Sequence, residues 1–314
     1  MNFLYCFDEN YNKQAFTSII SLLDNVHEKI NIFVIHNKKL INNEIPNKVL
    51  NHQNLNMINL YEFNNREYFF PNLEGSHVSE ATYYRLFLDN YLKDDIEKLV
   101  YLDADTVCLS NPMDLINLQF EDLLKSKKLI AARTELKKSK IENYETVGIY
   151  AREYPFERLG IDENYFNAGV MLIDYKAWKK ENMKEKLLKN LNILKNEVIT
   201  WDQDILNSVV NGNYQELDKK FNFFDKDVNK ENDDDILFLH YLGSHKPWSS
   251  SGIYNYSAKF YHANFYKLFN TYHFQHSWKK LSIKNLVKAL FNGKFLNIDK
   301  KSIYLYHFIK SLIK

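Results

Sequence analysis

The 314-residue sequence is poor in residues that break or cross-link a chain: eight glycines, five prolines and two cysteines. It contains no low-complexity stretch typical of a flexible linker. Cys6 and Cys108 lie in separate apolar segments, which excludes a disulfide framework and predicts reduced, buried thiols. No run reaches the roughly 18 apolar residues of a membrane span. Residues 1–9 lack the pattern of a signal peptide, so we expect a cytoplasmic protein.

The composition is that of a folded protein with a large core. Hydrophobic residues make up 45% of the chain, and a chain of this length buries roughly 75% of its unfolded surface. We find no internal repeat. The sequence predicts one large domain over residues 1–261 and an appendage over residues 262–314.

Strand and helix patterns alternate over the first two thirds of the chain. This alternation predicts an α/β fold in which helices cover both faces of a sheet. We expect strands at 2–7, 30–36, 57–60, 98–103, 129–132, 168–174 and 236–242. We expect helices at 11–23, 79–91, 176–194 and 202–210.

Two aspartates follow the apolar strand predicted to end near residue 103. Asp103 and Asp105 are two residues apart, so their side chains share one face of an extended chain. Neighbouring carboxylates repel each other, and a cation beside them removes that repulsion. The pair therefore predicts a bound divalent metal ion.

A histidine on the strand predicted over 236–242 offers a third ligand. His240 stands where a core side chain is expected, and two carboxylates with an imidazole suit manganese better than magnesium or calcium. The alternative for His240 alone is a hydrogen-bonded histidine in the core. Gly243 lets a phosphate group approach the backbone closely, and Lys246 supplies a positive charge suited to phosphate. Together these residues favour a metal-diphosphate site.

Six segments resemble, in order, the motifs of glycosyltransferase family 8. They are Cys6 to Tyr11, His77 to Leu86, Tyr101 to Asp105, Tyr165 to Val170, Asp202 to Asn207 and His240 to Trp248. An Asp-x-Asp motif alone arises by chance, whereas six ordered blocks are specific. The resemblance implies a GT-A fold, an α/β nucleotide-binding sheet, that uses Mn²⁺ to hold the diphosphate of a UDP-sugar. It also implies transfer with retention of the anomeric configuration.

The resemblance implies roles at the nucleotide end of the donor. Asp8 and Asn10 contact the uridine, at the sheet edge where open α/β folds bind ligands, and Ala104 lies at the nucleotide. Arg85 approaches the donor sugar or the diphosphate; its alternative is an ion pair of little energetic weight on a helix surface. The metal and diphosphate residues derived above keep those roles in the family.

The resemblance also implies roles at the sugar end. Asn167 and Gln203 face the transferred sugar, while Asp202 and Asp204 hold its hydroxyl groups. Retention by double displacement needs a carboxylate nucleophile beneath the anomeric carbon, but the matching position, Gln203, is an amide. A front-face reaction, in which the acceptor attacks from the side that UDP leaves, is therefore favoured. Asp202 as a transient nucleophile is the alternative.

The last 42 residues form a separate electrostatic unit. Nine lysines and one acid, Asp299, give residues 273–314 a net charge of +8, against −7 for the rest. Apolar residues recur at helical spacing over 281–291 and 302–314. These basic amphipathic helices either pack on the domain or lie on an anionic membrane. On a membrane, each nearby lysine would add about 1 kcal/mol to the binding free energy. The resemblance favours the membrane. Nucleic acid is disfavoured, because the aromatic residues form no stacking platform.

These observations predict a retaining, Mn²⁺-dependent hexosyltransferase. It is expected to move galactose, or else glucose, from a UDP-sugar to a hydroxyl group of a glycan or glycoprotein acceptor. One alternative is a membrane-associated module that binds UDP-sugars without turnover. Another is a sugar nucleotidyltransferase, which the absence of a glycine-rich phosphate loop near residue 8 disfavours.

Overall fold

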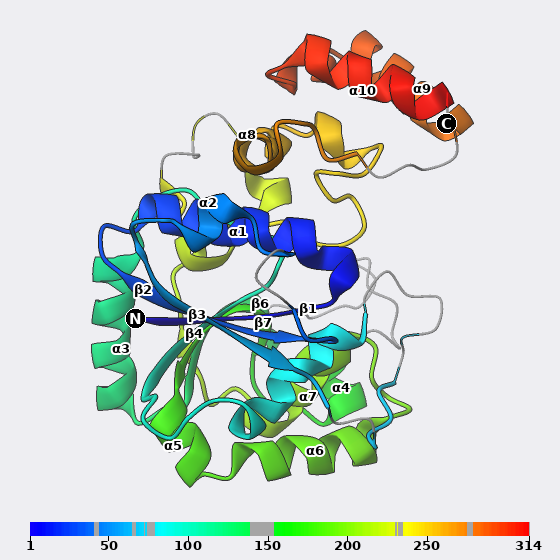
Figure 1. Ribbon diagram of the computed structural model, residues 1–314. Helices are drawn as coiled ribbons and strands as arrows, with labels where there is room; N and C mark the ends of the chain where they lie inside the picture. The colour runs from blue at the N-terminus through cyan, green and yellow to red at the C-terminus, as the bar shows by residue number, and fades with distance from the viewer. Residues whose placement is uncertain are drawn as a thin grey trace.

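The computed structural model describes residues 1–40, 44–64, 67–71, 73, 79–138, 154–229, 231, 235–274 and 279–313. A central sheet lies between two layers of helices, and the C-terminal helices stand above one of these layers (Figure 1). His77 and Val78, the first two residues of the second motif, lie outside the described residues.

The central sheet has seven strands in the order β3-β2-β1-β4-β7-β6-β8. The strands are β1 (Asn2–Phe7), β2 (Ile30–His36), β3 (Leu55–Glu62), β4 (Lys98–Leu102), β6 (Ile130–Leu136), β7 (Tyr165–Asp174) and β8 (Gln215–Glu216). β1 pairs in parallel with β2 and β4, whereas β7 runs antiparallel to β4 and β6. This mixed sheet confirms the predicted α/β class. Because β1 and β4 are parallel neighbours, Asp8 and Asp103 follow them at the same edge.

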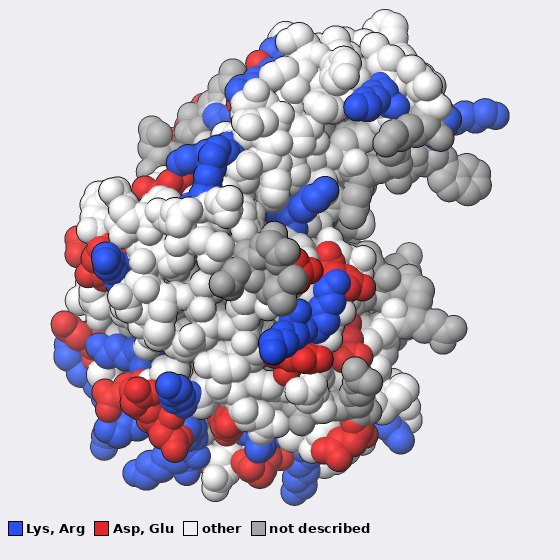
Figure 2. All heavy atoms as spheres, viewed as in Figure 1, with Lys and Arg blue, Asp and Glu red and all other residues white. Residues whose placement is uncertain are grey.

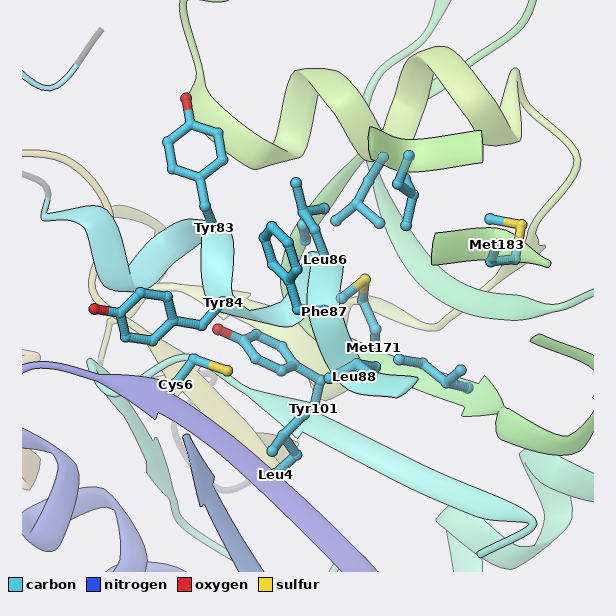
Figure 3. Close-up of a cluster of buried hydrophobic side chains, with 14 of the residues drawn as sticks. Leu4, Cys6, Tyr83, Tyr84, Leu86, Phe87, Leu88, Tyr101, Met171 and Met183 are labelled. Atoms are coloured by element: carbon cyan, nitrogen blue, oxygen red, sulfur yellow. The ribbon is translucent and has the colours of Figure 1, made fainter. Parts of the chain in front are cut away.

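Side chains along β1 alternate between two cores, as the period of a strand requires. Phe3, Tyr5 and Phe7 face the core beneath α1 (Asn12–Asn25), whereas Leu4 and Cys6 face the opposite core. Figure 3 shows the opposite core, where Cys6 lies near Tyr84 and Tyr101. Both cysteines are buried and free, as predicted.

Helices cover both faces of the sheet (Figure 1). On the side of α1 lies α2 (Asn47–Leu50), and on the other side lie α5 (Tyr175–Lys180), α6 (Met183–Leu194) and α7 (Trp201–Val210). The single helix expected over 176–194 is in fact two, because Asn182 takes a left-handed conformation between them. The short helix α4 (Pro155–Leu159) begins with a proline, a residue suited to the first turn.

The long helix α3 (Met113–Ser126) is among the helices that the sequence analysis did not predict. It buries Met113, Ile116, Phe120 and Leu123 against the same core as α1. These residues recur at intervals of three and four, which is the spacing of a helix face. The signal was therefore present in the sequence but was not assigned.

The segment that carries Arg85 is helical but tighter than an α-helix. η3 (Glu80–Asn90) consists of 3₁₀-helical turns with a kink at Phe87, and it is capped by Ser79, whose side chain accepts a hydrogen bond from the Ala81 amide. All side chains from Tyr83 to Leu88 are buried. Packing around the whole segment, rather than along one stripe, therefore sets its geometry.

A small second sheet completes the functional edge. β10 (Phe238–His240) pairs antiparallel with β5 (Thr106–Cys108) and parallel with β9 (Phe223–Phe224). β10 is shorter than the strand expected over 236–242. Its register sets His240 opposite Thr106, so the histidine lies next to the turn that holds the two aspartates.

The C-terminal region forms its own apolar cluster. The C-terminal region contains η10 (Gly252–Tyr254), α8 (Ala258–Phe269), α9 (Lys279–Phe291), η11 (Lys294–Asn297) and α10 (Lys301–Ile313). Tyr304 and Phe308 pack with Ile253 and Tyr254, and the Tyr254 and Tyr304 hydroxyls lie 2.5 Å apart. The domain boundary predicted after residue 261 stays a prediction and falls inside α8. Among the described residues, no helix is long and apolar enough to cross a membrane.

Candidate functional site

A cavity of about 310 Å³ opens at the edge of the sheet where β1 and β4 end. Its walls come from β1, η3, the turn between β4 and β5, the start of β7, the start of α7 and the loop after β10. Predicted site residues in its lining are Asp8, Arg85, Asp103, Ala104, Asp105, Asn167, Asp202, Gln203, His240, Gly243 and Lys246. Residues from segments far apart in the chain therefore meet around one space.

Two predicted contact residues do not line the cavity. Asn10 is exposed, and its backbone and side-chain amides donate to Asp8 at 3.0 and 3.3 Å. Asp204 is fully buried and accepts hydrogen bonds from Arg158 and Tyr165, each at 2.8 Å. Asp204 thus holds α7 and α4 together, and the expectation that it contacts a sugar hydroxyl is wrong for this structure.

Asp103, Asp105 and His240 form a cluster whose potential ligand atoms lie within 4.8 Å of one another. His240 Nε2 lies 3.3 Å from Asp105 Oδ1 and 3.7 Å from Asp103 Oδ2. The turn is held by Thr106, whose amide and hydroxyl donate to the Asp103 carbonyl at 3.1 and 2.8 Å. Two ligands from the turn between β4 and β5 and one from β10 therefore converge on one point.

The residues present fit a divalent metal. Asp105 Oδ1 is buried and has no hydrogen-bond partner among the described residues, although such atoms are normally satisfied. Burial alone would raise the pKa of Asp105, but the Lys246 ammonium beside it holds that pKa below its ordinary value. An ionised, buried and unbonded carboxylate oxygen is a ready ligand for a cation.

A chain of amides orients the His240 ring. Asn222 Nδ2 donates to Asn167 Oδ1 at 2.8 Å, which turns Asn222 Oδ1 toward His240 Nδ1 at 2.9 Å. His240 Nδ1 is then the protonated nitrogen, and the lone pair of Nε2 faces the aspartates. Such a partner fixes both ring and tautomer of a metal-binding histidine. The sequence analysis did not single out Asn222, because it is a neutral amide that belongs to none of the six motifs.

Gly169 leaves room for the histidine. A Cβ atom at this position would lie 2.1 Å from His240 Cε1 and 3.0 Å from Asp103 Oδ2. The Gly169 carbonyl also accepts from the Asp103 amide at 2.8 Å. The strand is thus too close to the cluster for any side chain at position 169.

We expect Gly169→Ala to weaken Mn²⁺ binding by about tenfold or more, the usual cost of disturbing a ligand's support. The added methyl group must displace the His240 ring or the backbone. Mn²⁺ titration followed by electron paramagnetic resonance measures the change. Gly160→Asn is the control, since Gly160 has open space around it and a left-handed conformation that Asn tolerates. Equal Mn²⁺ affinity in the two variants would contradict the expectation.

Arg85 is a buried hub rather than a surface residue. Its Nη2 donates to Asp202 Oδ1 at 3.1 Å, and its Nε also donates to Asp202. Its Nη1 donates to Asp103 Oδ1 at 3.2 Å and to the Ala168 carbonyl at 2.7 Å. The guanidinium lies 4.3 Å from the centre of the Tyr101 ring. The alternative of a surface ion pair is wrong, because Arg85 is only 4% exposed.

Gln203 lies on the first turn of α7, where Trp201 has a left-handed φ of 50°. For a residue with a side chain, such a conformation costs about 1–3 kcal/mol. Gln203 Oε1 accepts from the Ala168 amide at 2.9 Å, and its Nε2 donates to Glu135 Oε2 at 3.1 Å. Asn167 Nδ2 donates to the same Glu135 oxygen at 3.0 Å. Glu135, a cavity carboxylate in no motif, was also missed.

His262 fastens the loop that carries Lys246. Its Nε2 lies 2.8 Å from the Pro247 carbonyl, and burial lowers the pKa of His262 to about 4. The unfolded chain takes up a proton below about pH 6.5, but the folded chain does so only near pH 4. Stability present above pH 6.5 is therefore lost as the pH falls.

We expect His262→Gln to lessen this loss, because glutamine can still donate to Pro247 but does not titrate. Between about pH 7.5 and pH 5, the free energy of unfolding of the wild type should fall by about 2 kcal/mol relative to the variant. Urea unfolding at both pH values gives the difference. Parallel pH profiles for the two proteins would rule out His262 as the titrating group.

Comparisons with known proteins give the family and the fold of the chain. The family model described as glycosyl transferase family 8 matches residues 2–252. A lipopolysaccharide 1,2-glucosyltransferase of Escherichia coli is 28% identical over 309 residues, covering 90% of this chain and 80% of its own. General stress protein A of Bacillus subtilis is 25% identical over 303 residues, covering 86% and 95%. The fold is similar to that of the galactosyltransferase LgtC, solved with donor and acceptor sugar analogs, with a TM-score of 0.69 at 21% identity over 86% of this chain and 96% of that one.

Proposed function

The chain belongs to glycosyltransferase family 8, and on this premise we propose that it transfers galactose or glucose from a UDP-sugar to a hydroxyl group of a glycan or glycoprotein. The observation that carries the proposal is the cavity in which two aspartates and a histidine converge beside Lys246. The relatives named above support a hexose as the transferred group. The choice between galactose and glucose stays open, with galactose preferred.

The donor diphosphate is proposed to bind between the aspartates and the loop after β10. Asp103, Asp105 and His240 would hold Mn²⁺, which supplies positive charge to the diphosphate when bound. Lys246 Nζ lies 2.6 Å from Asp105 Oδ2 and would add a positive charge beside the diphosphate. Negative charge that develops on the departing UDP would be stabilised there. Asp8 and Ala104 line the proposed uridine end of the cavity.

The geometry favours the front-face reaction over a covalent intermediate. Asp202 is 1% exposed, and its oxygens accept hydrogen bonds from Arg85 and from Thr82 Oγ1 at 2.5 Å. A carboxylate so engaged is a poor nucleophile, and it acts instead to position its neighbours. The acceptor hydroxyl would then bond to the anomeric carbon as the bond to UDP breaks, and its proton would pass to the departing phosphate oxygen.

The test is release of UDP from UDP-galactose and UDP-glucose by the purified protein, with Mn²⁺ and with a chelator. Slow hydrolysis of one donor that stops with the chelator supports the proposal and identifies the sugar. UDP binding without release, even with a range of acceptors, would favour a module that only binds. Consumption of UTP and a sugar phosphate would favour a nucleotidyltransferase.

We further propose a cytoplasmic protein that sits at the inner face of a membrane through α9 and α10. Part of the apolar surface of these helices is buried in the C-terminal apolar cluster described above, but the rest is exposed. The exposed residues include Val287 at 44%, Leu290 at 54% and Phe291 at 90%. Figure 2 shows the C-terminal helices at the upper right as a mostly uncharged surface with isolated basic side chains. Exposed apolar and basic residues together suit an anionic bilayer.

We expect the double variant Val287→Asp, Phe291→Asp to bind anionic vesicles about tenfold more weakly or worse, given about 1.5–3 kcal/mol for each large apolar side chain buried. Both residues are exposed, so folding and UDP affinity should be unchanged. Co-sedimentation with vesicles of equal parts phosphatidylglycerol and phosphatidylcholine measures the effect. The matched control is Leu118→Asp, Leu124→Asp on α3, where both leucines are about half exposed. Failure of the wild type to sediment with vesicles would contradict the membrane proposal.

A further inference from the structure

A second cavity, of about 460 Å³, lies on the other side of the loop that carries Lys246. Leu242 lines both this cavity and the donor cavity. The loop places Lys246 in the donor cavity, and His245 and Ser251 in the second. α9 and the residues after it form the opposite wall. Figure 2 shows the molecule hollowed on the right, between the C-terminal helices and the domain below them.

The wall of the second cavity is basic. Lys226, Lys288 and Lys294 line it, against a single acid, Asp225. None of the three lysines forms an ion pair with a residue in the described ranges. Asp225 Oδ1 is occupied by the Leu242 amide, 3.0 Å away. The three ammonium groups are thus available to an anion.

Neutral polar groups also line the second cavity. Asn255, Asn285 and Asn292 line the cavity together with Ser251. The Asn255 side chain makes no hydrogen bond within the described part of the chain. Amides and hydroxyls of this kind both donate and accept hydrogen bonds, as sugar hydroxyl groups require. The cavity therefore combines groups for a saccharide with groups for a negative charge.

The loop between the two cavities is built to stay in place. A Cβ atom on Gly252 would lie 2.2 Å from the carbonyl oxygens of both His245 and Lys246, so only glycine permits this close turn. Ser251 Oγ lies 2.9 Å from His245 Nδ1. On the far side, Asn285 Nδ2 of α9 donates to Ser250 Oγ at 3.2 Å. The C-terminal helix is therefore joined to the loop that borders the donor.

We propose that this second cavity binds the acceptor, and that the acceptor is an anionic saccharide, bearing a phosphate or a carboxylate group. The inference rests on the proposed function, because it needs a donor sugar in the first cavity. Leu242 lines both cavities, so an acceptor in the second cavity would lie beside the loop that borders the donor site. α9 supplies Asn285 and Lys288 to the cavity, so the C-terminal segment contributes to substrate choice.

The test measures binding of four probes in the presence of saturating UDP and Mn²⁺, so that the donor cavity is filled. The probes are mannose 6-phosphate and trigalacturonate, each with a neutral counterpart, mannose and maltotriose. We expect at least one anionic probe to bind about tenfold or more tightly than its counterpart, since charge-assisted hydrogen bonds are the stronger ones. Which anionic probe is preferred distinguishes phosphate from carboxylate. Equal affinity within both pairs would overturn the proposal.

The matched variants are Lys288→Gln, Lys294→Gln and, as control, Lys280→Gln, Lys284→Gln. Both pairs remove two positive charges from the same C-terminal region, but only the first pair lines the cavity. We expect the first to lose the preference for the anionic probe and the control to keep it. If both double variants lost the preference for the anionic probe equally, the effect would come from the overall charge of the region, and the proposed site would be overturned. UDP affinity is measured in the same samples: if UDP does not bind, the proposed function fails, whereas UDP binding without probe selectivity removes only this inference.

Discussion

Replacing Asp103 with Asn is expected to abolish metal-dependent binding of UDP and to lower turnover by about 10²–10³-fold. The carboxylate is one of only two negatively charged ligands in the cluster with His240. Its Oδ1 is already held by Arg85 Nη1 at 3.2 Å and by the Tyr101 hydroxyl at 2.7 Å, which leaves Oδ2 for a cation. Asparagine keeps the shape of the side chain but removes the charge.

Calorimetric titration of UDP, with Mn²⁺ and with a chelator, measures this effect. For the wild type, the chelator should weaken binding strongly; for the Asp103 variant, the two titrations should coincide. Asp94→Asn is the control, because the Asp94 side chain is 99% exposed and its partner Lys179 lies away from the cavity. Unchanged Mn²⁺-dependent affinity in the Asp103 variant would refute the metal site.

Replacing Arg85 with Met is expected to destabilise the fold by about 3–5 kcal/mol, the cost of leaving a buried charge without its partner. The Asp202 side chain is 1% exposed, and burial raises the pKa of Asp202 even though Arg85 opposes this. Without the guanidinium, this carboxylate must be protonated or the site must open. Activity should be lost as well, because Arg85 holds both Asp202 and Asp103.

Urea unfolding of the single and double variants tests the pairing. If the cost comes from the uncompensated charge, Arg85→Met with Asp202→Asn should cost less than the sum of the two single changes. Lys176→Gln is the control, since its pair with Glu97 is exposed and its loss should leave the stability nearly unchanged. Additive single costs would show that Arg85 acts through packing alone.

Several features of the site were readable from the sequence because they are local. Asp103 and Asp105 are two apart on an extended segment, and any fold that keeps this segment extended aims both at one place. The strands at 2–7 and 30–36 match β1 and β2 to the residue, since their apolar runs are bounded by polar residues. The six ordered motifs likewise predicted the family and the mixed α/β fold.

Other features depend on residues that meet only after folding. Asn222 orients His240, and Glu135 joins Asn167 to Gln203, yet none of these contacts follows a periodicity along the chain. The alternative for Arg85 was an ion pair on a helix surface, but the whole stretch from Tyr83 to Leu88 on η3 is buried. A charged group in such surroundings finds partners from α7 and β4, which sequence spacing cannot specify.

The C-terminal helices show most clearly which features follow from the sequence and which depend on the tertiary structure. Their amphipathic pattern follows from the sequence, because helical spacing alone decides which residues share a stripe. Which apolar residues are covered depends on what the rest of the chain brings to them: Phe308 is buried in one cluster with Ile253 and Tyr254, whereas Phe291 stays exposed. The sequence by itself determined most strands of the central sheet, the acidic pair and the family. The tertiary structure decided which buried charges are paired, which amides orient the histidine and which faces remain open, because these depend on contacts between distant segments.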